Sequence, residues 1–156
     1  MQFLSLGTQY TITALILLSK QETGTAVSAS KLAKPLNTPS TYLSQMLARL
    51  VSSGIVGTRR GISGGVYLNR EPEDISLFEI ITAVEGDSFF QSCFLGISGC
   101  GDIEPCPFHE EWRAKKADIK SWLEDTSLAD IARDSSPLWK SDFVHFARKT
   151  EAGTRT

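Results

Sequence analysis

The chain of 156 residues has no apolar run long enough to cross a bilayer: its longest, Ala14 to Leu18, is far shorter than the roughly 20 residues that a spanning helix needs. Its first residues carry no positive charge ahead of apolar side chains, so they do not predict a secretory signal. Cysteine is scarce, and three thiols cannot all pair within one chain. We therefore expect a cytoplasmic protein with no membrane partner and no disulfide framework, whose cysteines serve metal binding, redox chemistry or packing.

Acidic residues are scarce in the first 70 positions, where Glu22 alone stands against seven basic side chains and the net charge is +6. The rest of the chain carries −8, and the whole chain −2. A phosphate backbone responds to the local field rather than to the net charge of the whole protein. The N-terminal half is therefore the candidate polyanion binder.

Apolar periodicity predicts a helical protein with one short hairpin. Helices are expected over residues 5–20, 28–34, 38–53, 76–84 and 107–125, with a last short turn at 127–133. Ser28 and Thr38 are expected as helix caps, and Ser76 with Glu79 forms a capping box. Strands at 55–60 and 66–68, joined by a glycine-rich turn, predict a β wing. The expected fold class is mainly α with a small β-hairpin wing, a winged helix-turn-helix followed by a long C-terminal helix.

The helix over 38–53 has an outer face that is polar but almost uncharged, and small hydroxyl and amide side chains suit base edges. In a winged helix-turn-helix this second helix enters the major groove, and paired arginines at the wing reach a phosphate or the minor groove. The glycine-rich turn does not predict a nucleotide site, because neither Lys-Ser nor Lys-Thr follows it. The candidate DNA-contacting residues are Ser40, Thr41, Tyr42, Ser44, Gln45, Arg49, Arg59 and Arg60.

An irregular loop between the last two long helices holds all three cysteines in the pattern Cys93-x6-Cys100-x5-Cys106-x2-His109. Iron-sulfur clusters tolerate such wide spacing, whereas structural zinc sites usually present close Cys-x2-Cys pairs. An iron-sulfur cluster is therefore favoured, with zinc and redox-active or inert thiols left open.

Several motifs together resemble the Rrf2 family of bacterial transcription regulators, over about residues 1 to 135. They are Ser40-Thr41-Tyr42-Leu43, Leu47-x2-Leu50-x3-Gly54-Ile55-Val56, Arg60-Gly61-x2-Gly64-Gly65-x2-Leu68, and the pairs Glu79-Ile80 and Val84-Glu85-Gly86. The resemblance implies a homodimer joined through the long C-terminal helix, and a 2Fe-2S or 4Fe-4S cluster on the loop cysteines that controls DNA affinity.

The Cys-x2-His ending is similar to that of the family's cluster-assembly regulators, in which histidine is the fourth ligand of a 2Fe-2S centre. This implies Cys93, Cys100, Cys106 and His109 as ligands. The family's nitric oxide sensors have a carboxylate ligand in the first helix, where this chain has Thr8 and Gln9, so the 4Fe-4S form is less favoured.

The resemblance implies four regions and a dimer interface. The regions are a winged helix-turn-helix DNA-binding domain at 1–86, a cluster-binding loop at 87–107, a dimerisation helix region at 108–135 and a tail at 136–156. The expected interface residues are Trp112, Ile119, Trp122 and Leu123.

Three functions compete on this sequence. The favoured one is a dimeric regulator of a palindromic site in double-stranded DNA, whose affinity depends on a cluster that senses iron, redox or nitric oxide status. The alternative is a DNA-binding regulator without a cluster, whose loop serves zinc, thiol redox or partner docking. An enzyme that uses Cys106 and His109 as nucleophile and base is not favoured. It would need an orienting carboxylate and an oxyanion site, and spacing of three residues on one helical turn does not by itself bring the two side chains together productively.

Overall fold

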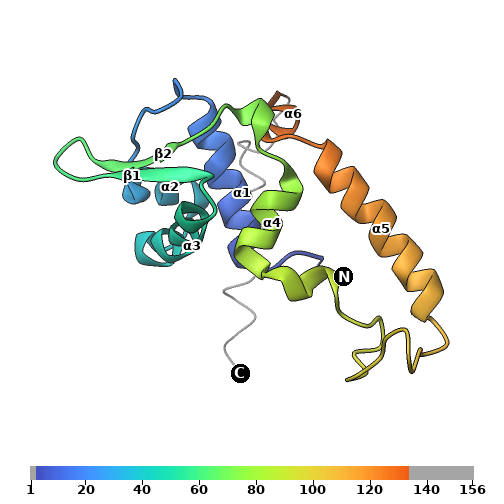
Figure 1. Cartoon of the computed structure of the whole chain (residues 1–156). Helices are drawn as coiled ribbons and strands as arrows, with labels where there is room; N and C mark the ends of the chain where they lie inside the picture. Colours follow the sequence, from blue (N-terminus) through green and yellow to red (C-terminus); the bar gives the residue numbers. More distant parts are fainter. Residues whose placement is uncertain (1–2, 134–156) are drawn as a thin grey trace.

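The computed structural model describes residues 3–133, and the tail at 136–156 lies outside this range. The elements in chain order are α1 (Leu6–Ser19), α2 (Ala29–Leu36), α3 (Ser40–Ser52), β1 (Val56–Arg59), β2 (Gly65–Leu68), the 3-10 turn η1 (Pro72–Asp74), α4 (Leu77–Glu85), the 3-10 turn η2 (Asp87–Phe90), α5 (His109–Asp125) and α6 (Leu128–Arg133). The predicted fold class, mainly α with one small antiparallel hairpin, is confirmed (Figure 1).

Helix α1 lies at the centre of the fold and contacts α2, α3, α4, α6 and β2. Its apolar residues Ala14, Leu15, Ile16 and Leu18 are all buried. Its buried threonines do not leave unpaired hydroxyls, because Thr11 donates to the Gly7 carbonyl at 2.8 Å. The helix-turn-helix and the wing are thus built around one buried helix.

The turn between α2 and α3 differs from the sequence-based expectation in two ways. Helix α2 continues past Lys34 through Pro35 to Leu36, whose buried side chain belongs to the core, and Asn37 ends it in the left-handed conformation. Thr38 is not the cap of α3: Pro39 occupies the N-cap position without a side-chain hydrogen bond, and the helix begins at Ser40.

The wing is tied to the body by a backbone bridge. In the hairpin Val56 pairs with Leu68 and Arg59 with Gly65. Val27 and Val66 exchange N–H to carbonyl bonds of 2.9 Å, which connects β2 to the segment before α2. Gly65 has φ of +152°, and an added Cβ there would lie 2.3 Å from the Val27 carbonyl oxygen.

The C-terminal part of the described chain returns to the core after a long excursion. The Ser76–Glu79 capping box of α4 is confirmed, and a bridge between Ser76 and Ser127 joins the start of α4 to the start of α6. Helix α5 extends from this junction to the cysteine loop, which lies far from the hairpin (Figure 1). No helix in residues 3–133 is long and apolar enough to span a membrane.

We expect Gly65→Ala to reduce the free energy of unfolding by about 1–3 kcal/mol, because the new methyl group collides with the Val27 carbonyl and must take an unfavourable φ. Urea denaturation of the full chain measures this. Gly101→Ala is the matched control, since an added Cβ there meets no atom within 4 Å. Equal midpoints for the two variants would contradict the role assigned to the close contact.

Candidate metal centre and DNA-facing surface

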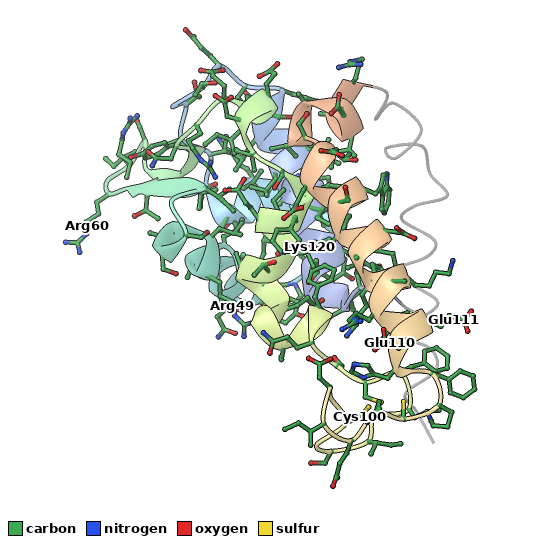
Figure 2. All side chains as sticks on the ribbon, turned by 45° about the vertical axis from the view of Figure 1, so that its right-hand side comes forward. Arg49, Arg60, Cys100, Glu110, Glu111 and Lys120 are labelled. Atoms are coloured by element: carbon green, nitrogen blue, oxygen red, sulfur yellow. The ribbon has the colours of Figure 1, made fainter. Side chains whose placement is uncertain are left out.

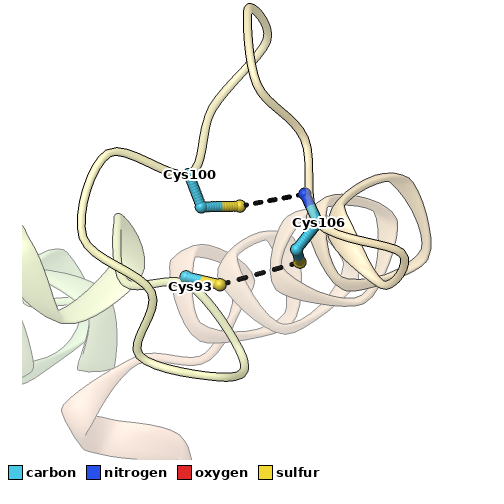
Figure 3. A group of neighbouring side chains, drawn as sticks. All are labelled: Cys93, Cys100 and Cys106. Carbon is cyan, nitrogen blue, oxygen red and sulfur yellow. Dashed lines mark hydrogen bonds between the residues drawn. The ribbon is translucent and has the colours of Figure 1, made fainter.

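The loop brings the three thiols of Cys93, Cys100 and Cys106 together (Figure 3). Their sulfur atoms all lie within 4.8 Å of one another, and the Sγ atoms of Cys93 and Cys106 are 3.7 Å apart. All three are half-buried free thiols. Residues separated by 13 positions in the sequence therefore form one cluster of soft donors.

His109, in the first turn of α5, lies beside one thiol of this cluster, that of Cys100. Its backbone N–H donates to the Cys106 carbonyl at 3.0 Å, and its Nδ1 lies 3.5 Å from Sγ of Cys100. Its other ring nitrogen, Nε2, is buried and lies 3.4 Å from a carboxylate oxygen of Asp102. One nitrogen facing the ligands and the other facing a carboxylate is the usual environment of a metal-binding histidine.

The thiols have different acidities because their hydrogen bonds differ. The backbone N–H of Ile97, assisted by that of Leu95, lowers the pKa of Cys93 to about 7 against the effect of burial. At Cys100 the backbone N–H of Cys106 favours the thiolate, but burial and the neighbouring thiols of Cys106 and Cys93 raise the pKa overall. Crowded thiolates repel one another, so a cation is needed for all three to ionise together.

The donor set fits a bound metal. A tetrahedral ion with metal–sulfur bonds of about 2.3 Å and a metal–nitrogen bond of about 2.0 Å places two sulfurs about 3.8 Å apart and a sulfur and a nitrogen about 3.5 Å apart. The Cys93–Cys106 distance of 3.7 Å and the Cys100–His109 distance of 3.5 Å match two of the six edges of such a site. The three sulfurs lie within 4.8 Å of one another, a group that does not include the His109 ring. Thiolate and imidazole are also the ligands that iron-sulfur clusters use.

Both ends of the loop are held by α5, a feature that the sequence analysis missed. The indole N–H of Trp112 donates to the Ser92 carbonyl at 2.9 Å, and Nζ of Lys116 donates to the same oxygen at 3.2 Å. The ring of Phe94 packs against Phe108 and Trp112 with centroids 5.9 and 5.4 Å away. No local pattern could reveal the Ser92 contact, because any residue offers a carbonyl.

The outward face of α3 is only partly free for DNA. Thr41 and Gln45 are exposed, whereas the exposed Ser44 donates its hydroxyl to the Ser40 carbonyl at 2.8 Å. Tyr42 is half-buried, with its ring 6.4 Å from that of Tyr10 in an edge-on arrangement. Tyr42 therefore holds the start of α3 against α1.

The three arginines predicted to contact DNA lie in different surroundings (Figure 2). Arg60 extends away from the protein at the hairpin. The guanidinium of Arg59 instead lies 5.3 Å above the ring of Tyr67, and its Nη2 is 3.4 Å from the Gly24 carbonyl oxygen. Arg49 turns toward α4 and donates to the Val84 carbonyl at 2.6 Å.

The residues predicted for the dimer interface also separate. Leu123 is 2% exposed and belongs to the core of its own chain, and Ile119 packs partly against that core. Trp122 is 60% exposed, and Trp112 is half-buried against the loop. On α5, Trp122 is therefore the large apolar side chain that remains open to a second chain.

A helix-turn-helix whose second helix is followed by a β wing defines a winged-helix DNA-binding regulator. The chain belongs to the Rrf2 family, described as an iron-dependent transcriptional regulator, whose family model matches residues 4–134. The family consists of transcriptional regulators, and this chain is accordingly a regulator rather than an enzyme.

Relatives of known name agree with this assignment. The chain is 28% identical over 134 residues to the HTH-type transcriptional regulator IscR of Vibrio atlanticus, covering 86% of this chain and 77% of the relative. Among solved structures it resembles CymR, the global cysteine regulator of B. subtilis, at 29% identity and a TM-score of 0.68, covering 85% of this chain and 98% of the other. T. potens IscR matches at 27% identity and a TM-score of 0.66, covering 86% and 88%.

Proposed function

We propose that this chain is a dimeric, DNA-binding transcriptional regulator whose operator affinity is controlled by an iron-sulfur cluster on Cys93, Cys100, Cys106 and His109. The observation that supports this most strongly is the placement of His109, with Nδ1 beside a thiol and Nε2 beside the Asp102 carboxylate. The family's description as iron-dependent and the IscR relatives favour iron, and we propose the 2Fe-2S form. Because such a regulator works on the chromosome, we place it in the cytoplasm.

When bound, the cluster supplies iron that holds the thiolates together and is lost on oxidation or iron limitation. The protonation states of two of the proposed ligands affect this binding. Cys93, with a pKa of about 7, is already partly ionised at neutral pH. His109 must be neutral to ligate, and the Asp102 carboxylate lies 3.4 Å from its Nε2.

Zinc is the second candidate for the same ligands, and one observation favours it. The three sulfurs lie within 4.8 Å of one another, as the ligands of a single tetrahedral ion do. Iron and zinc are distinguished directly by visible absorption.

For DNA recognition we propose that α3 enters the major groove with Thr41 and Gln45 toward the bases, while Arg60 reaches a phosphate. Two copies related by a two-fold axis would read a palindromic site with half-site centres about 34 Å apart. The exposed Trp122 on α5 is the proposed centre of the contact between the copies, because large aromatic side chains are enriched in interface cores.

The cluster is tested with protein purified without oxygen. We expect the parent to show iron-sulfur charge-transfer bands, Cys106→Ala to lose them, His109→Ala to keep a less stable cluster, and the exposed loop control Glu104→Gln to match the parent. A colourless parent with one zinc per chain would indicate the zinc alternative.

Operator affinity of the reconstituted and metal-free forms, at matched salt, should differ at least tenfold, or about 1.4 kcal/mol. Equal affinities would remove the regulatory role.

The groove assignment is tested by two substitutions with opposite signatures. Arg60→Ala should weaken operator binding tenfold or more, because a phosphate contact is lost. The salt slope, which is the slope of the logarithm of the binding constant against the logarithm of the salt concentration, should fall in magnitude by about one. Gln45→Ala should leave the salt slope unchanged and alter base preference. Arg133→Ala removes the same charge on α6 and should bind like the parent. Parental binding by both Arg60→Ala and Gln45→Ala would show that the groove assignment is wrong.

The dimer contact is tested at Trp122, since a charge at the buried Leu123 would disrupt the chain's own core. Trp122→Glu should give monomers in sedimentation and loss of operator binding. Ser121→Glu adds the same charge at the neighbouring exposed position and should remain dimeric. A dimer of Trp122→Glu with parental stability would place the interface elsewhere.

A further inference from the structure

Arg49 is an exposed residue in the last turn of α3, the proposed recognition helix, but its guanidinium is bonded to another helix. Its Nη1 donates a hydrogen bond of 2.6 Å to the carbonyl oxygen of Val84, near the end of α4. The two residues are 35 positions apart in the sequence. The contact joins the helix that faces DNA to the helix that leads into the cysteine loop.

The end of α4 needs such a partner. The last four carbonyls of a helix lack intrahelical donors, and the negative end of the helix dipole favours a cation. The last turn of α4 contains no basic residue of its own, and Gly86 turns the chain away with φ of +87°. The cation therefore comes from α3, which makes Arg49 the C-terminal cap of a different helix.

Glu85, the next residue along α4, extends this junction to α1. Its carboxylate accepts the Ser5 backbone N–H at 2.8 Å and the Thr8 hydroxyl at 2.5 Å. Burial acts to raise the pKa of Glu85, but these hydrogen bonds and the charge of Arg49 lower it overall. The last turns of α3 and α4 and the start of α1 thus meet at one charged cluster, directly before Gly86 begins the loop.

The segment from Glu85 to Cys93 is held at two points. The ring of Phe90 packs 5.1 Å from that of Phe78 on α4, and the Ser92 carbonyl is fixed by Trp112. This short segment is the route along which a displacement of the loop at Cys93 would reach the end of α4.

We propose that Arg49 is a positioning residue that couples the cysteine loop to the recognition helix through the end of α4, and that it is not a DNA contact. The coupling of metal binding to DNA affinity rests on the metal-dependent function proposed above. The hydrogen bond from Arg49 to the end of α4, called the tether below, does not depend on that function. A phosphate contact and a tether predict different salt dependence, because only a lost phosphate contact reduces the number of counterions released.

The experiment compares Arg49→Met, Arg49→Lys and the control Arg60→Met in the full chain. Operator affinity is measured over a range of salt for the metal-loaded and metal-free forms, and amide hydrogen exchange is measured without DNA. Arg49→Met should keep the parental salt slope. It should reduce the ratio of operator affinities between the metal-loaded and metal-free forms at least tenfold, or to one. Amide exchange at the last turn of α4 should become at least tenfold faster. Arg49→Lys should restore part of each effect, since lysine can also donate to a carbonyl. Arg60→Met should lower the slope by about one, with parental exchange.

The outcomes separate the two halves of the proposal. If loaded and metal-free parent bind the operator equally, the metal-dependent function fails, but an unchanged salt slope with faster exchange in Arg49→Met still supports the tether. A salt slope lowered by about one with parental exchange would show that Arg49 contacts phosphate, and would overturn the proposal. Parental slope, ratio and exchange in Arg49→Met would overturn it as well. Circular dichroism and urea midpoints check that each variant is folded.

Discussion

Helix α1 has no polar face broad enough to meet water, and this constraint determines how the rest of the described chain packs. A helix that is apolar on most sides is stable only when other elements surround it. Helices α2, α3, α4 and α6 and strand β2 all lie against it. The hydroxyls of Thr11 and Thr13 donate to carbonyls within the helix and that of Thr8 donates to Glu85, so burial leaves all three satisfied. The result is a rigid base that presents α3 and the wing in fixed relation.

The cysteine loop is not ordered by apolar burial, because it has almost no apolar core of its own. Its order comes from a few contacts: two donors on the Ser92 carbonyl, an aromatic cluster around Phe94, and the proximity of the thiols to His109. Hydrogen bonds of this kind contribute about 1 kcal/mol each. That is close to the 1.4 kcal/mol that changes an affinity tenfold, so contacts of this strength would be sufficient for the proposed regulation.

Local sequence patterns predicted the elements of the fold well, and long-range contacts account for what they missed. Periodicity and the Ser76–Glu79 capping box placed the helices, and the glycines marked the wing. The end of α2 was misplaced because burial of Leu36 draws the helix through Pro35. The roles of Arg49 and Leu123 depend on carbonyls and core positions of distant segments, which spacing along the chain does not encode. The cysteines and His109 were identifiable because soft donors so close in sequence are typical of a metal or cluster site, whereas Asp102 carried no signal.

The two ends of the loop, at Ser92 and His109, are both fixed on the first turns of α5. Residues inserted or deleted between them therefore add only a slowly growing closure cost and do not disturb the core. Selection can alter the spacing of the cysteines, or remove them, while the DNA-binding half stays intact. Under the proposed function, this arrangement would let the metal site change while the winged helix-turn-helix keeps its structure.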